Sequence, residues 1–397
     1  MKECSRCLLP ETHEAIFFDQ DGVCSVCLNR EKRNTIDWEV RKQSLIRIVT
    51  EVKDKSDYDC IVPFSGGKDS TFTLYYIVRE LGLKPLVVSF DHGFYRPNMI
   101  ENRNRVIELL GVDFLNFRPN WNLVKRLMLQ SLLEKGDFCW HCHTGIFSYP
   151  MWVAIEKQIP LIIWGEPSSE YTSYYSYDED EEVDEKRFNQ IVNLGITADD
   201  MIERLGEGFT ARDFKPFTYP PVEKLRQLRF RSVPLGSFIP WDVKIQSSLI
   251  VRELGWKGDE VEGVPESHNY EKIECYMQGV RDYIKYLKRG YSRVTHLMTL
   301  DIRNGRIDRE SAKKVVAEYE GYRPATLDLF LSFVGITEAE FNEIVMQHRI
   351  DPWKGAVPVR IGKKPHDYGL WQSKPGLPSV ESERIIKRFK EGDWSDT

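Results

Sequence analysis

The segment Ser65-Gly66-Gly67-Lys68-Asp69-Ser70 combines residue types that can hold a phosphate group. It follows an apolar run at 60–64, which predicts a buried strand, and it opens a helical pattern at 69–81 that Gly82 ends. A glycine-rich turn between a strand and a helix directs backbone N–H groups and a helix N-terminus at an anion. Lys68 adds a positive charge, and the hydroxyls of Ser65 and Ser70 add donors. The sequence therefore predicts a phosphate site at 65–70.

The spacing of the glycines narrows the class of phosphate site. Gly66 and Gly67 are adjacent, which excludes both the Walker pattern and the dinucleotide pattern G-x-G-x-x-G. The pattern S-G-G-x-D-S resembles the PP-loop of the ATP pyrophosphatases. This resemblance implies that ATP is cut between its α and β phosphates and that an oxygen of the substrate is adenylylated.

Two further motifs follow apolar runs that predict strands. Asp91-His92-Gly93 ends the run at 85–91, and Gly165 follows the run at 160–164. Alone, Asp91-His92-Gly93 would be an ordinary turn, but beside the phosphate segment it resembles the adenosine loop of the same enzymes. Because ligands of open α/β sheets bind at the carboxyl ends of strands, we expect Asp91, His92 and Gly165 in the ATP site.

Cleavage of ATP to pyrophosphate requires Mg²⁺ to neutralise the leaving group. Carboxylates together with phosphate oxygens are the ligands that Mg²⁺ prefers. We predict Asp69 and Glu170 as ligands and Glu166 as a residue that faces the substrate. The alternative is that Glu166 and Glu170 are solvated surface carboxylates.

The segment Cys139-Trp140-His141-Cys142-His143 gathers four soft ligands within five residues. Three interpretations remain open: a catalytic patch on the substrate side, a second metal site, or buried packing. Adjacent residues point in different directions, so at most two or three could bind one ion. We expect His141 and Cys142 to be catalytic, and Cys139, Trp140 and His143 to contact the substrate.

Two cysteine pairs stand near the N-terminus, Cys4-x2-Cys7 and Cys24-x2-Cys27, with sixteen residues between them. Each pair forms a tight knuckle, and two knuckles supply four thiolates in tetrahedral arrangement, which is typical of a structural zinc ribbon. The alternative is four buried cysteines without a metal.

Composition limits the class of protein. The chain has 397 residues, 41% hydrophobic content and a formal net charge of −6, which does not favour a nucleic-acid binder. It contains no run of eighteen apolar residues and no apolar signal region. We expect a soluble cytoplasmic protein without membrane insertion, in which eight cysteines serve metal binding or catalysis rather than disulfides.

The pattern of elements predicts an α/β fold. Strands at 60–64, 85–91, 112–117 and 160–164 alternate with helices at 69–81, 98–110, 122–133 and around 152–157, which predicts a parallel sheet covered on both faces. The chain is then mostly helical, with a last short strand at 238–242 and helices at 244–254, 271–289, 292–303, 309–319, 326–334 and 338–348.

These elements suggest five regions. They are a zinc ribbon at 1–30, a linking helix at 31–56, an α/β domain at 57–245, a helical C-terminal region at 246–350 and an irregular tail at 351–397. An acidic insertion near 171–186 predicts a solvated loop, although its four tyrosines could form a lid or a stacking surface for a sugar.

A helix start at 305–310 carries Arg306 and Arg309, with Asp308 as the expected N-cap. We predict that Arg306 and Arg309 reach an anionic substrate. The alternative is two ordinary surface arginines.

Taken in order, these motifs resemble the N-acetyl sugar amidotransferases, a family of the PP-loop ATP pyrophosphatase superfamily with the adenine nucleotide alpha hydrolase-like fold. These enzymes act in bacterial surface-polysaccharide, lipopolysaccharide, pseudaminic-acid and legionaminic-acid pathways. The resemblance covers nearly the whole chain. It implies that ATP, Mg²⁺ and Zn²⁺ are used to convert an acetamido group on a nucleotide-linked sugar or nonulosonate precursor to an acetamidino group, with release of AMP and pyrophosphate.

The source of nitrogen must lie outside this sequence. A glutaminase needs a nucleophilic cysteine with a base, but Cys4 belongs to the ribbon, and Cys60 and Cys275 lie in apolar or mixed surroundings. The resemblance implies a partner glutaminase with a barrel subunit, similar to the imidazole-glycerol-phosphate synthase pair.

Two rival functions remain. A tRNA-modifying enzyme of the same superfamily, which thiolates or ligates a base, would explain Cys139, Cys142 and the ribbon. The acidic net charge counts against it, because it should carry a basic face. The second rival is an ATP-gated scaffold without catalysis, against which the intact phosphate segment counts.

Overall fold

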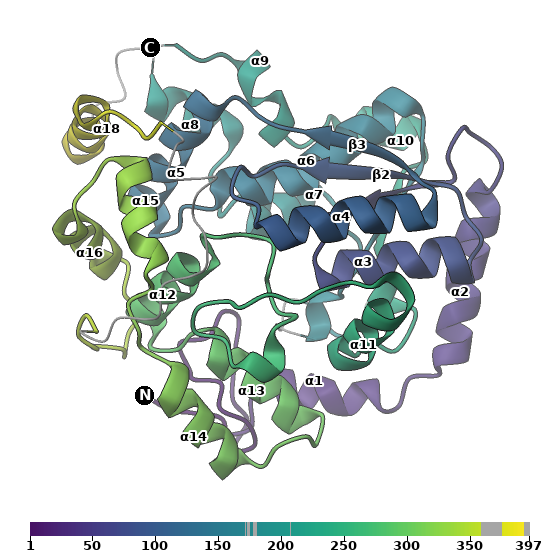
Figure 1. Ribbon diagram of the computed structural model, residues 1–397, viewed down its shortest axis with the longest axis horizontal. Coiled ribbons are helices and arrows are strands. Elements are labelled where there is room, and N and C mark those ends of the chain that lie inside the picture. Colours follow the sequence, from purple (N-terminus) through teal and green to yellow (C-terminus); the bar gives the residue numbers. More distant parts are fainter. Residues whose placement is uncertain (171, 173–174, 178–180, 207, 359–374, 393–397) are drawn as a thin grey trace. The chain divides into compact units, whose positions relative to one another are not determined.

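The computed structural model describes residues 1–170, 172, 175–177, 181–206, 208–358 and 375–392 (Figure 1). The chain divides into two compact units. We name the first the ribbon unit, which comprises Met1–Ile36, Pro167–Asp180 and Asp259–Pro375. We name the second the sheet unit, which comprises Asp37–Glu166, Glu181–Gly258 and Gly376–Thr397.

The sheet unit is built on five parallel strands in the order β3-β2-β1-β4-β5. The strands are β1 Cys60–Pro63, β2 Pro85–Phe90, β3 Asp113–Phe117, β4 Leu161–Trp164 and β5 Arg231–Pro234. The predicted parallel α/β sheet is therefore confirmed. The strand order reverses beside β1, so the carboxyl ends of β1 and β4 lie at the topological switch point where such sheets bind ligands.

Helices cover both faces of this sheet (Figure 1). On one face α3 (Lys68–Tyr75) packs against β1 and β4 and, together with α4 (Pro97–Leu110), against α11 (Val243–Leu254). On the other face α6 (Trp140–Lys157) packs against β1, β2 and β4 and against α5 (Trp121–Lys135). The strands β1 and β2 are almost entirely buried as a result, which explains why they are continuous apolar runs in the sequence.

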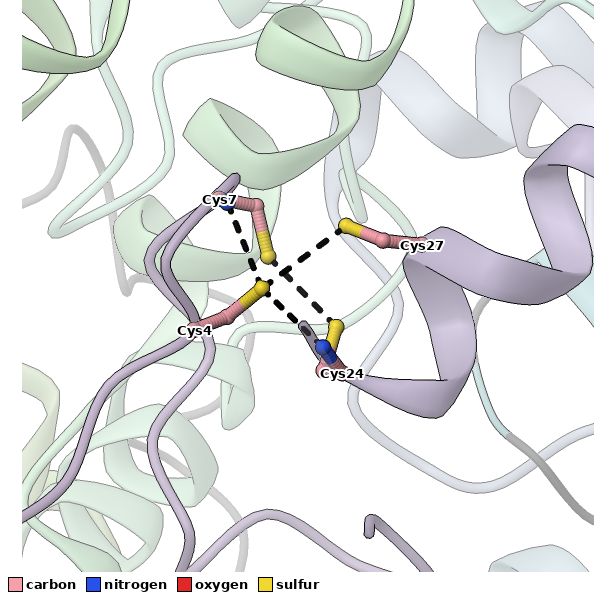
Figure 2. A group of neighbouring side chains, drawn as sticks. All are labelled: Cys4, Cys7, Cys24 and Cys27. Carbon is pink, nitrogen blue, oxygen red and sulfur yellow. Dashed lines mark hydrogen bonds between the residues drawn. The ribbon is translucent and has the colours of Figure 1, made fainter. Parts of the chain in front are cut away.

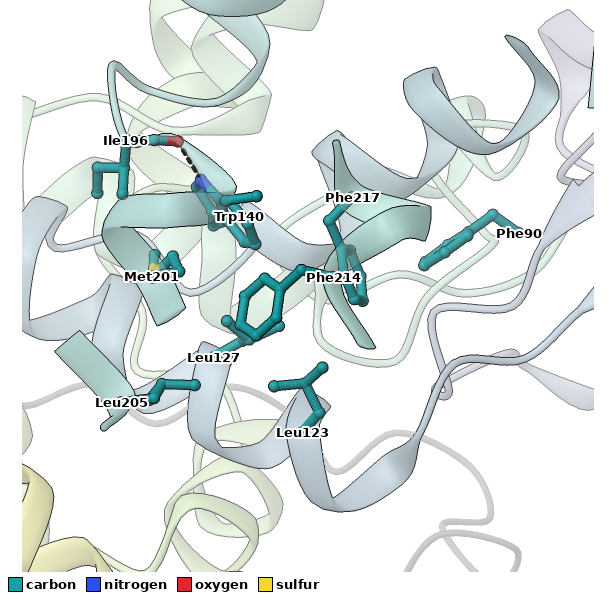
Figure 3. Packing of buried hydrophobic residues seen from close by; sticks show 10 residues of the cluster. Phe90, Leu123, Leu127, Trp140, Ile196, Met201, Leu205, Phe214 and Phe217 are labelled. Atoms are coloured by element: carbon teal, nitrogen blue, oxygen red, sulfur yellow. Dashed lines mark hydrogen bonds between the residues drawn. The ribbon is translucent and has the colours of Figure 1, made fainter. Parts of the chain in front are cut away.

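An aromatic core fixes the start of α6 (Figure 3). Phe90 from β2 packs edge-on against Phe217 with ring centroids 5.8 Å apart, and Trp140 lies against the same Phe217 ring at 6.0 Å. The indole N–H of Trp140 donates to the carbonyl of Ile196 at 2.9 Å. The helix α6 begins at this buried tryptophan, so the remaining side chains of its first turn have defined directions.

The other elements of the sheet unit are short except for α2 and α18. They are α2 Trp38–Val52, η1 Tyr76–Glu80, α7 Glu185–Arg187, η3 Phe188–Val192, α8 Ala198–Leu205, α9 Ala211–Phe214, η4 Lys215–Phe217, α10 Val222–Gln227, η5 Leu235–Ser237 and α18 Ser379–Glu391.

The ribbon unit combines the N-terminal segment with the helical C-terminal region. Its elements are α1 Ser25–Arg33, η2 Ser168–Glu170, η6 Glu266–His268, α12 Gln278–Arg289, α13 Arg293–Arg303, α14 Arg309–Tyr319, α15 Thr326–Val334 and α16 Glu338–Gln347. Asp308 caps α14 as predicted, since its carboxylate accepts from the Ser311 N–H at 2.9 Å.

Three predictions of secondary structure are wrong. The single linking helix at 31–56 is two helices, because Asp37 accepts from the N–H groups of Glu39 and Val40 and starts α2 anew. The strand at 238–242 does not form: Asp242 caps α11, and the last strand is β5. The tail at 351–397 is not wholly irregular, because Ser379–Glu391 form α18. The Glu381 carboxylate of this helix lies 2.8 Å from the Arg126 guanidinium of α5.

Two smaller predictions also need correction. The helix expected at 271–289 begins only at Gln278. In the acidic insertion, Asp178, Glu179 and Asp180 lie outside the described residues, but Glu181 is buried and forms an ion pair with Arg187, so it is not part of a solvated loop.

None of the helices among the described residues has the length and apolar character that crossing a bilayer demands.

Candidate functional site

The phosphate segment forms a closed turn between β1 and α3. The Gly67 N–H donates to the Ser65 hydroxyl oxygen at 3.2 Å, and the Ser65 N–H donates to the Ser70 hydroxyl oxygen at 3.3 Å. Gly66 has φ +87°, and a Cβ there would lie 2.7 Å from the Met99 sulfur, so only glycine fits without strain. The helix α3 begins directly behind the turn, at Lys68. The backbone N–H groups of its first turn point toward the turn, which is a favourable position for an anion.

Two buried charges occupy the first turn of α3. The Lys68 ammonium lies 2.6 Å from the Asp69 carboxylate, and the two residues are 4% and 8% exposed. This pair places one cation and one carboxylate at the phosphate turn, which are the groups needed to bind a phosphate and its divalent cation.

Gly165, after β4, approaches the same turn. A Cβ at Gly165 would meet the Thr73 hydroxyl oxygen at 3.1 Å and the Asp69 carbonyl oxygen at 3.4 Å. The absence of a side chain lets the end of β4 come close to α3. The structure thus brings Gly165 and the phosphate segment together, as predicted. Glu166 follows as a half-buried residue of the sheet unit, and its contact with substrate stays a prediction.

The loop after β2 is held by an arginine that the sequence reasoning missed. The Asp91 carboxylate is 1% exposed and lies 2.6 Å from the Arg118 guanidinium, while its other oxygen accepts from the Gly93 N–H at 2.8 Å. Gly93 has φ +94°, and a Cβ there would collide with the Trp121 ring at 2.0 Å. Arg118 directly follows β3 and keeps 62% of its side chain exposed, so the loop presents a cation at the carboxyl edge of the sheet. Its position one residue after a strand was the signal available in the sequence.

His92 and the first turn of α6 meet at this edge. The His92 ring lies edge-on to Tyr95, with centroids 4.2 Å apart. His141 is 2% exposed, and burial, together with the nearby His92 and His143, lowers the pKa of His141 to about 3. His141 is therefore a neutral imidazole at physiological pH. Burial also raises the pKa of the Tyr95 hydroxyl, and the nearby Asp91 and Cys142 add to that effect.

The helix divides the patch at 139–143 between two environments. Cys139, Cys142 and His143 are half-buried and share one side of α6, since they are three and four residues apart. Trp140 instead lies in the aromatic core with no exposed surface, so the prediction that it contacts substrate is wrong. Among the described residues, these side chains form no group of three or more ligand atoms close enough to share an ion, so the second-metal interpretation finds no support.

We predict that His141→Ala lowers turnover roughly a hundredfold while leaving ATP affinity within about twofold, because a positioned imidazole contributes that much to proton transfer. Steady-state rates and direct nucleotide binding measure the two effects separately. Lys157→Ala, at the exposed end of the same helix, is the matched control. Full turnover in a normally stable His141→Ala protein would show that His141 only fills space.

The four N-terminal cysteines form a closed group (Figure 2). Their sulfurs all lie within 4.8 Å of one another, with Cys4 and Cys27 at 3.9 Å and Cys7 and Cys24 at 3.7 Å. A tetrahedral ion with metal–sulfur bonds of about 2.3 Å separates its sulfurs by about 3.8 Å. The donor set therefore fits one metal ion, whereas a multi-iron cluster would hold its ligating sulfurs further apart.

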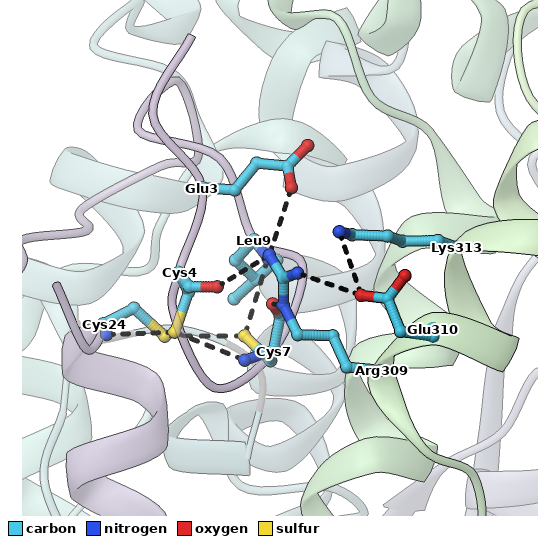
Figure 4. A network of polar contacts seen from close by, with 8 residues as sticks. All are labelled: Glu3, Cys4, Cys7, Leu9, Cys24, Arg309, Glu310 and Lys313. Atoms are coloured by element: carbon cyan, nitrogen blue, oxygen red, sulfur yellow. Dashed lines mark hydrogen bonds and ion pairs between the residues drawn. The ribbon is translucent and has the colours of Figure 1, made fainter.

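The ribbon is held by arginines of the C-terminal helices (Figure 4). Arg309 donates to the carbonyls of Cys7 at 3.0 Å and Cys4 at 3.3 Å and lies 3.3 Å from the Glu3 carboxylate. These contacts correct the prediction that Arg309 reaches a substrate: its guanidinium anchors the cysteine loop. Arg306 forms an ion pair with Asp301 at 3.3 Å, and its contact with substrate stays a prediction.

Glu170 also has a structural role. Its carboxylate lies 2.9 Å from Arg33 and 3.8 Å from Arg30, both of α1, and accepts from the Tyr177 hydroxyl. These partners already neutralise the Glu170 carboxylate. Its role as a magnesium ligand beside Asp69 stays a prediction.

The C-terminal helices match a known domain. Residues 266–367 match the model of the LPS biosynthesis protein WbpG-like, C-terminal domain. This finding supports the resemblance to the N-acetyl sugar amidotransferases.

Two curated proteins share segments with this chain. An uncharacterized protein of Methanocaldococcus jannaschii is 30% identical over 115 residues, which is 28% of this chain and 41% of that protein. The glutamine-hydrolyzing GMP synthase of Pyrobaculum aerophilum is 31% identical over 87 residues, which is 22% of this chain and 17% of that protein. The chain thus spans less than half the length of either relative.

Among solved structures, the U34-tRNA thiolase NcsA from Methanococcus maripaludis with its [4Fe-4S] cluster aligns with a TM-score of 0.32 at 14% identity. The alignment covers 81% of this chain and 87% of the thiolase chain.

Proposed function

We propose that this protein is an ATP-dependent N-acetyl sugar amidotransferase that converts an acetamido group to an acetamidino group. Two features of the sheet unit carry the proposal. The phosphate turn holds the buried pair of Lys68 and Asp69, and the loop after β2 meets the first turn of α6. Both occur in a chain whose C-terminal part matches a lipopolysaccharide biosynthesis family.

The reaction has two steps. The acetamido oxygen attacks the α-phosphorus of ATP, and the bond to the β-phosphate oxygen breaks and releases pyrophosphate. Ammonia then attacks the imidate carbon, the carbon–oxygen bond breaks, and AMP leaves with the former acetamido oxygen while a proton is lost. An amide oxygen is a poor leaving group, which is why activation by adenylylation is needed.

Residues of the sheet unit supply binding and charge in these steps. Backbone N–H groups of Gly66 and Gly67 with Lys68 would hold the phosphates, and Asp69 would hold a Mg²⁺ ion that neutralises the leaving pyrophosphate. Arg118 and His92 would lie beside the nucleoside, and His141 and Cys142 beside the acceptor. The rest of the acceleration comes from positioning and exclusion of water.

The cysteine group of the ribbon unit takes a separate role. We assign Zn²⁺ to Cys4, Cys7, Cys24 and Cys27 as a structural ion, because four buried thiolates leave no open position for a substrate.

Nitrogen should reach this chain only as ammonia. Free ammonium at high concentration and raised pH should support amidination, because NH₃ and not NH₄⁺ is the nucleophile, whereas glutamine alone should not. A partner glutaminase with its barrel subunit should make glutamine effective at neutral pH through a shielded channel. Label from ¹⁵N-amide glutamine appearing in the sugar amidine without a partner would mean that this chain contains a glutaminase site.

Mass spectrometry tests the proposed reaction most directly. Candidate UDP- and CMP-linked N-acetyl sugars are incubated with ATP and ammonium, and conversion of an acetamido to an acetamidino group lowers the mass by about 1 Da. With ¹⁸O in the acetamido group, the label must appear in AMP and not in pyrophosphate. Label in pyrophosphate or in water alone would overturn the adenylylation step.

A tRNA-modifying activity is the second candidate. Cys139 and Cys142 lie half-buried on one side of α6, and Cys142 lies near Tyr95; a sulfur-transferring enzyme would also need cysteines. Filter binding to bulk tRNA at moderate salt separates the two functions, since a tRNA enzyme should bind in this assay and the sugar enzyme should not.

A further inference from the structure

A group of aromatic and basic side chains lies together inside the ribbon unit. The His13 ring stacks on Tyr291 with centroids 5.6 Å apart and an interplanar angle of 27°. The Lys285 ammonium lies 4.6 Å from the centroid of the same Tyr291 ring. Residues 12–14 are fixed there by Arg289 of α12, which donates to the Thr12 carbonyl and lies 3.4 Å from the Glu14 carboxylate.

One cation of this group, Lys285, lacks a carboxylate partner at ion-pair distance among the described residues, whereas the two arginines are paired. Arg293 lies 3.4 Å from Glu271 and 3.4 Å from Asp282, and Arg289 pairs with Glu14. Lys285 has no carboxylate within ion-pair distance and no hydrogen-bond acceptor among the residues that the structure describes. Burial lowers the pKa of Lys285 to about 8, and Glu14 offsets part of this effect. A buried cation without a direct partner is costly unless an anion joins it.

His296 lies close to the same basic residues. His296 is 7% exposed, and burial together with Lys285, Arg293, His13 and Arg303 holds its pKa well below the usual value. The side chains that act most strongly on His296 are basic, and burial keeps its imidazole neutral.

Hydrogen-bond donors in this group also lack acceptors. The Tyr291 hydroxyl, the Arg293 Nε and one terminal nitrogen of Arg303 are buried, and none has an acceptor among the described residues. Tyr291 as a whole is only 1% exposed. A buried donor left unsatisfied costs about 1–3 kcal/mol, so several of them beside an unpaired cation indicate a missing acceptor.

We propose that Lys285, Tyr291 and Arg293, with His13 and His296 around them, form a binding site for an oxyanion carried by the sugar substrate. A metal cation does not suit this site, because the unsatisfied groups on Lys285 and Arg293 are donors only and cannot ligate a cation. A neutral hydroxyl would satisfy a donor but would leave the charge of Lys285 unmatched. A phosphate or a carboxylate satisfies both.

Two features suit a substrate rather than a permanently buried ion pair. Lys285 is half-buried and the Glu14 side chain is 44% exposed, so part of the group remains in contact with solvent. The basic residues from Lys285 to Arg303 fall within the segment 266–367 that matches the WbpG-like domain. Lys285, Tyr291, Arg293 and His296 therefore lie in the segment that matches this domain, and the site belongs to the ribbon unit. Its assignment to the sugar rests on the proposed function.

Direct binding tests the site without requiring catalysis. Inorganic phosphate and D-glucuronate are titrated by calorimetry into the full chain carrying Lys68→Ala, which removes the cation of the phosphate turn. Binding of at least one anion is expected. If only phosphate binds, the oxyanion of the substrate is a phosphate, and if only glucuronate binds, it is a carboxylate. Adding Lys285→Met should weaken that binding at least tenfold, Lys285→Arg should retain it, and the exposed Lys314→Met is the matched control.

Stability separates an anion site from a structural one. Without anion, Lys285→Met should melt at the same temperature as the parent or higher, because an uncompensated buried charge is removed. Phosphate or glucuronate should raise the melting temperature of the parent and of Lys314→Met but not of Lys285→Met. A lower melting temperature with unchanged anion binding would overturn the proposal, as would failure of both anions to bind the parent.

Kinetics then connect the site to the sugar. In the otherwise native chain, Lys285→Met should raise KM for the sugar at least tenfold and leave KM for ATP unchanged. If no sugar is amidinated but anion binding depends on Lys285, the site stands and the proposed function fails. If amidination proceeds with the sugar KM unchanged in Lys285→Met, the site is not the substrate site.

Discussion

Lys68→Ala and Asp69→Ala should each slow sugar-dependent release of pyrophosphate on the order of a thousandfold, about 4 kcal/mol of transition-state stabilisation. The structure gives the reason, because Lys68 and Asp69 are buried side by side in the first turn of α3, 2.6 Å apart, behind the closed turn at Gly66 and Gly67. Charge that develops on the transferring phosphate meets these groups in a preorganised and poorly solvated position.

The measurement is a pyrophosphate assay with product analysis. AMP and pyrophosphate should appear in equal amounts, and Asp69→Ala should lose the dependence on Mg²⁺ concentration that the parent shows. The control is Lys55→Ala, an exposed lysine before the amino end of β1, which should keep full activity. Stoichiometric ADP and phosphate would refute the assignment of the turn.

Cys24→Ser should lose the bound metal ion and unfold much of the ribbon unit. A structural zinc site contributes on the order of 10 kcal/mol to the folding of its own domain. The cysteine group is buried with Leu9, Val23 and Val26, so it is the core of the N-terminal segment. Loss of the ion leaves thiols 3.7–3.9 Å apart without the bonds that hold them.

Metal analysis should find about one zinc per chain in the parent and none in Cys24→Ser. Cys275→Ser, which changes a half-buried cysteine outside the group, is the control and should retain the metal. Because the phosphate turn belongs to the sheet unit, Cys24→Ser should still bind ATP. Carefully purified parent protein without zinc would contradict the assignment of this ion.

The destabilisation should also spread to the C-terminal helices. Arg309 of α14 donates to the carbonyls of Cys4 and Cys7, and Arg303 of α13 lies with one nitrogen 3.9 Å from the Cys7 sulfur. Hydrogen exchange should therefore show loss of protection in both α13 and α14 of Cys24→Ser. Unchanged protection there would limit the role of the ribbon to its own loop.

Features that depend on local chemistry were readable from the sequence. The phosphate turn, the cysteine pairs and the cap at Asp308 each need particular residue types at fixed spacing within one loop or one turn of helix. The central strands were equally clear, because a strand buried on both faces is a continuous apolar run.

Features that depend on partners far along the chain were not readable. The strand β5 has the unremarkable sequence Arg-Ser-Val-Pro and exists because it pairs with β4, while α18 exists in a segment expected to be irregular. The sequence at 139–143 does not determine which side of α6 faces the aromatic core. Trp140 was therefore predicted to contact the substrate, whereas in the structure it packs on Phe217.

Tertiary structure also decided what the charged residues do. Arg309 could bind an anionic substrate, but its guanidinium donates to backbone carbonyls of the ribbon. Glu170 could bind a metal ion, but its carboxylate pairs with arginines of α1. Conversely, nothing in the sequence distinguishes Arg118 and Lys285 from other basic residues. The fold places Arg118 2.6 Å from Asp91 and Lys285 4.6 Å from the centroid of the Tyr291 ring, and these neighbours suggest their roles. A residue type sets which bonds a side chain can make, but the fold sets which partner is within reach, and only that partner determines whether a charge is neutralised or remains available to a ligand.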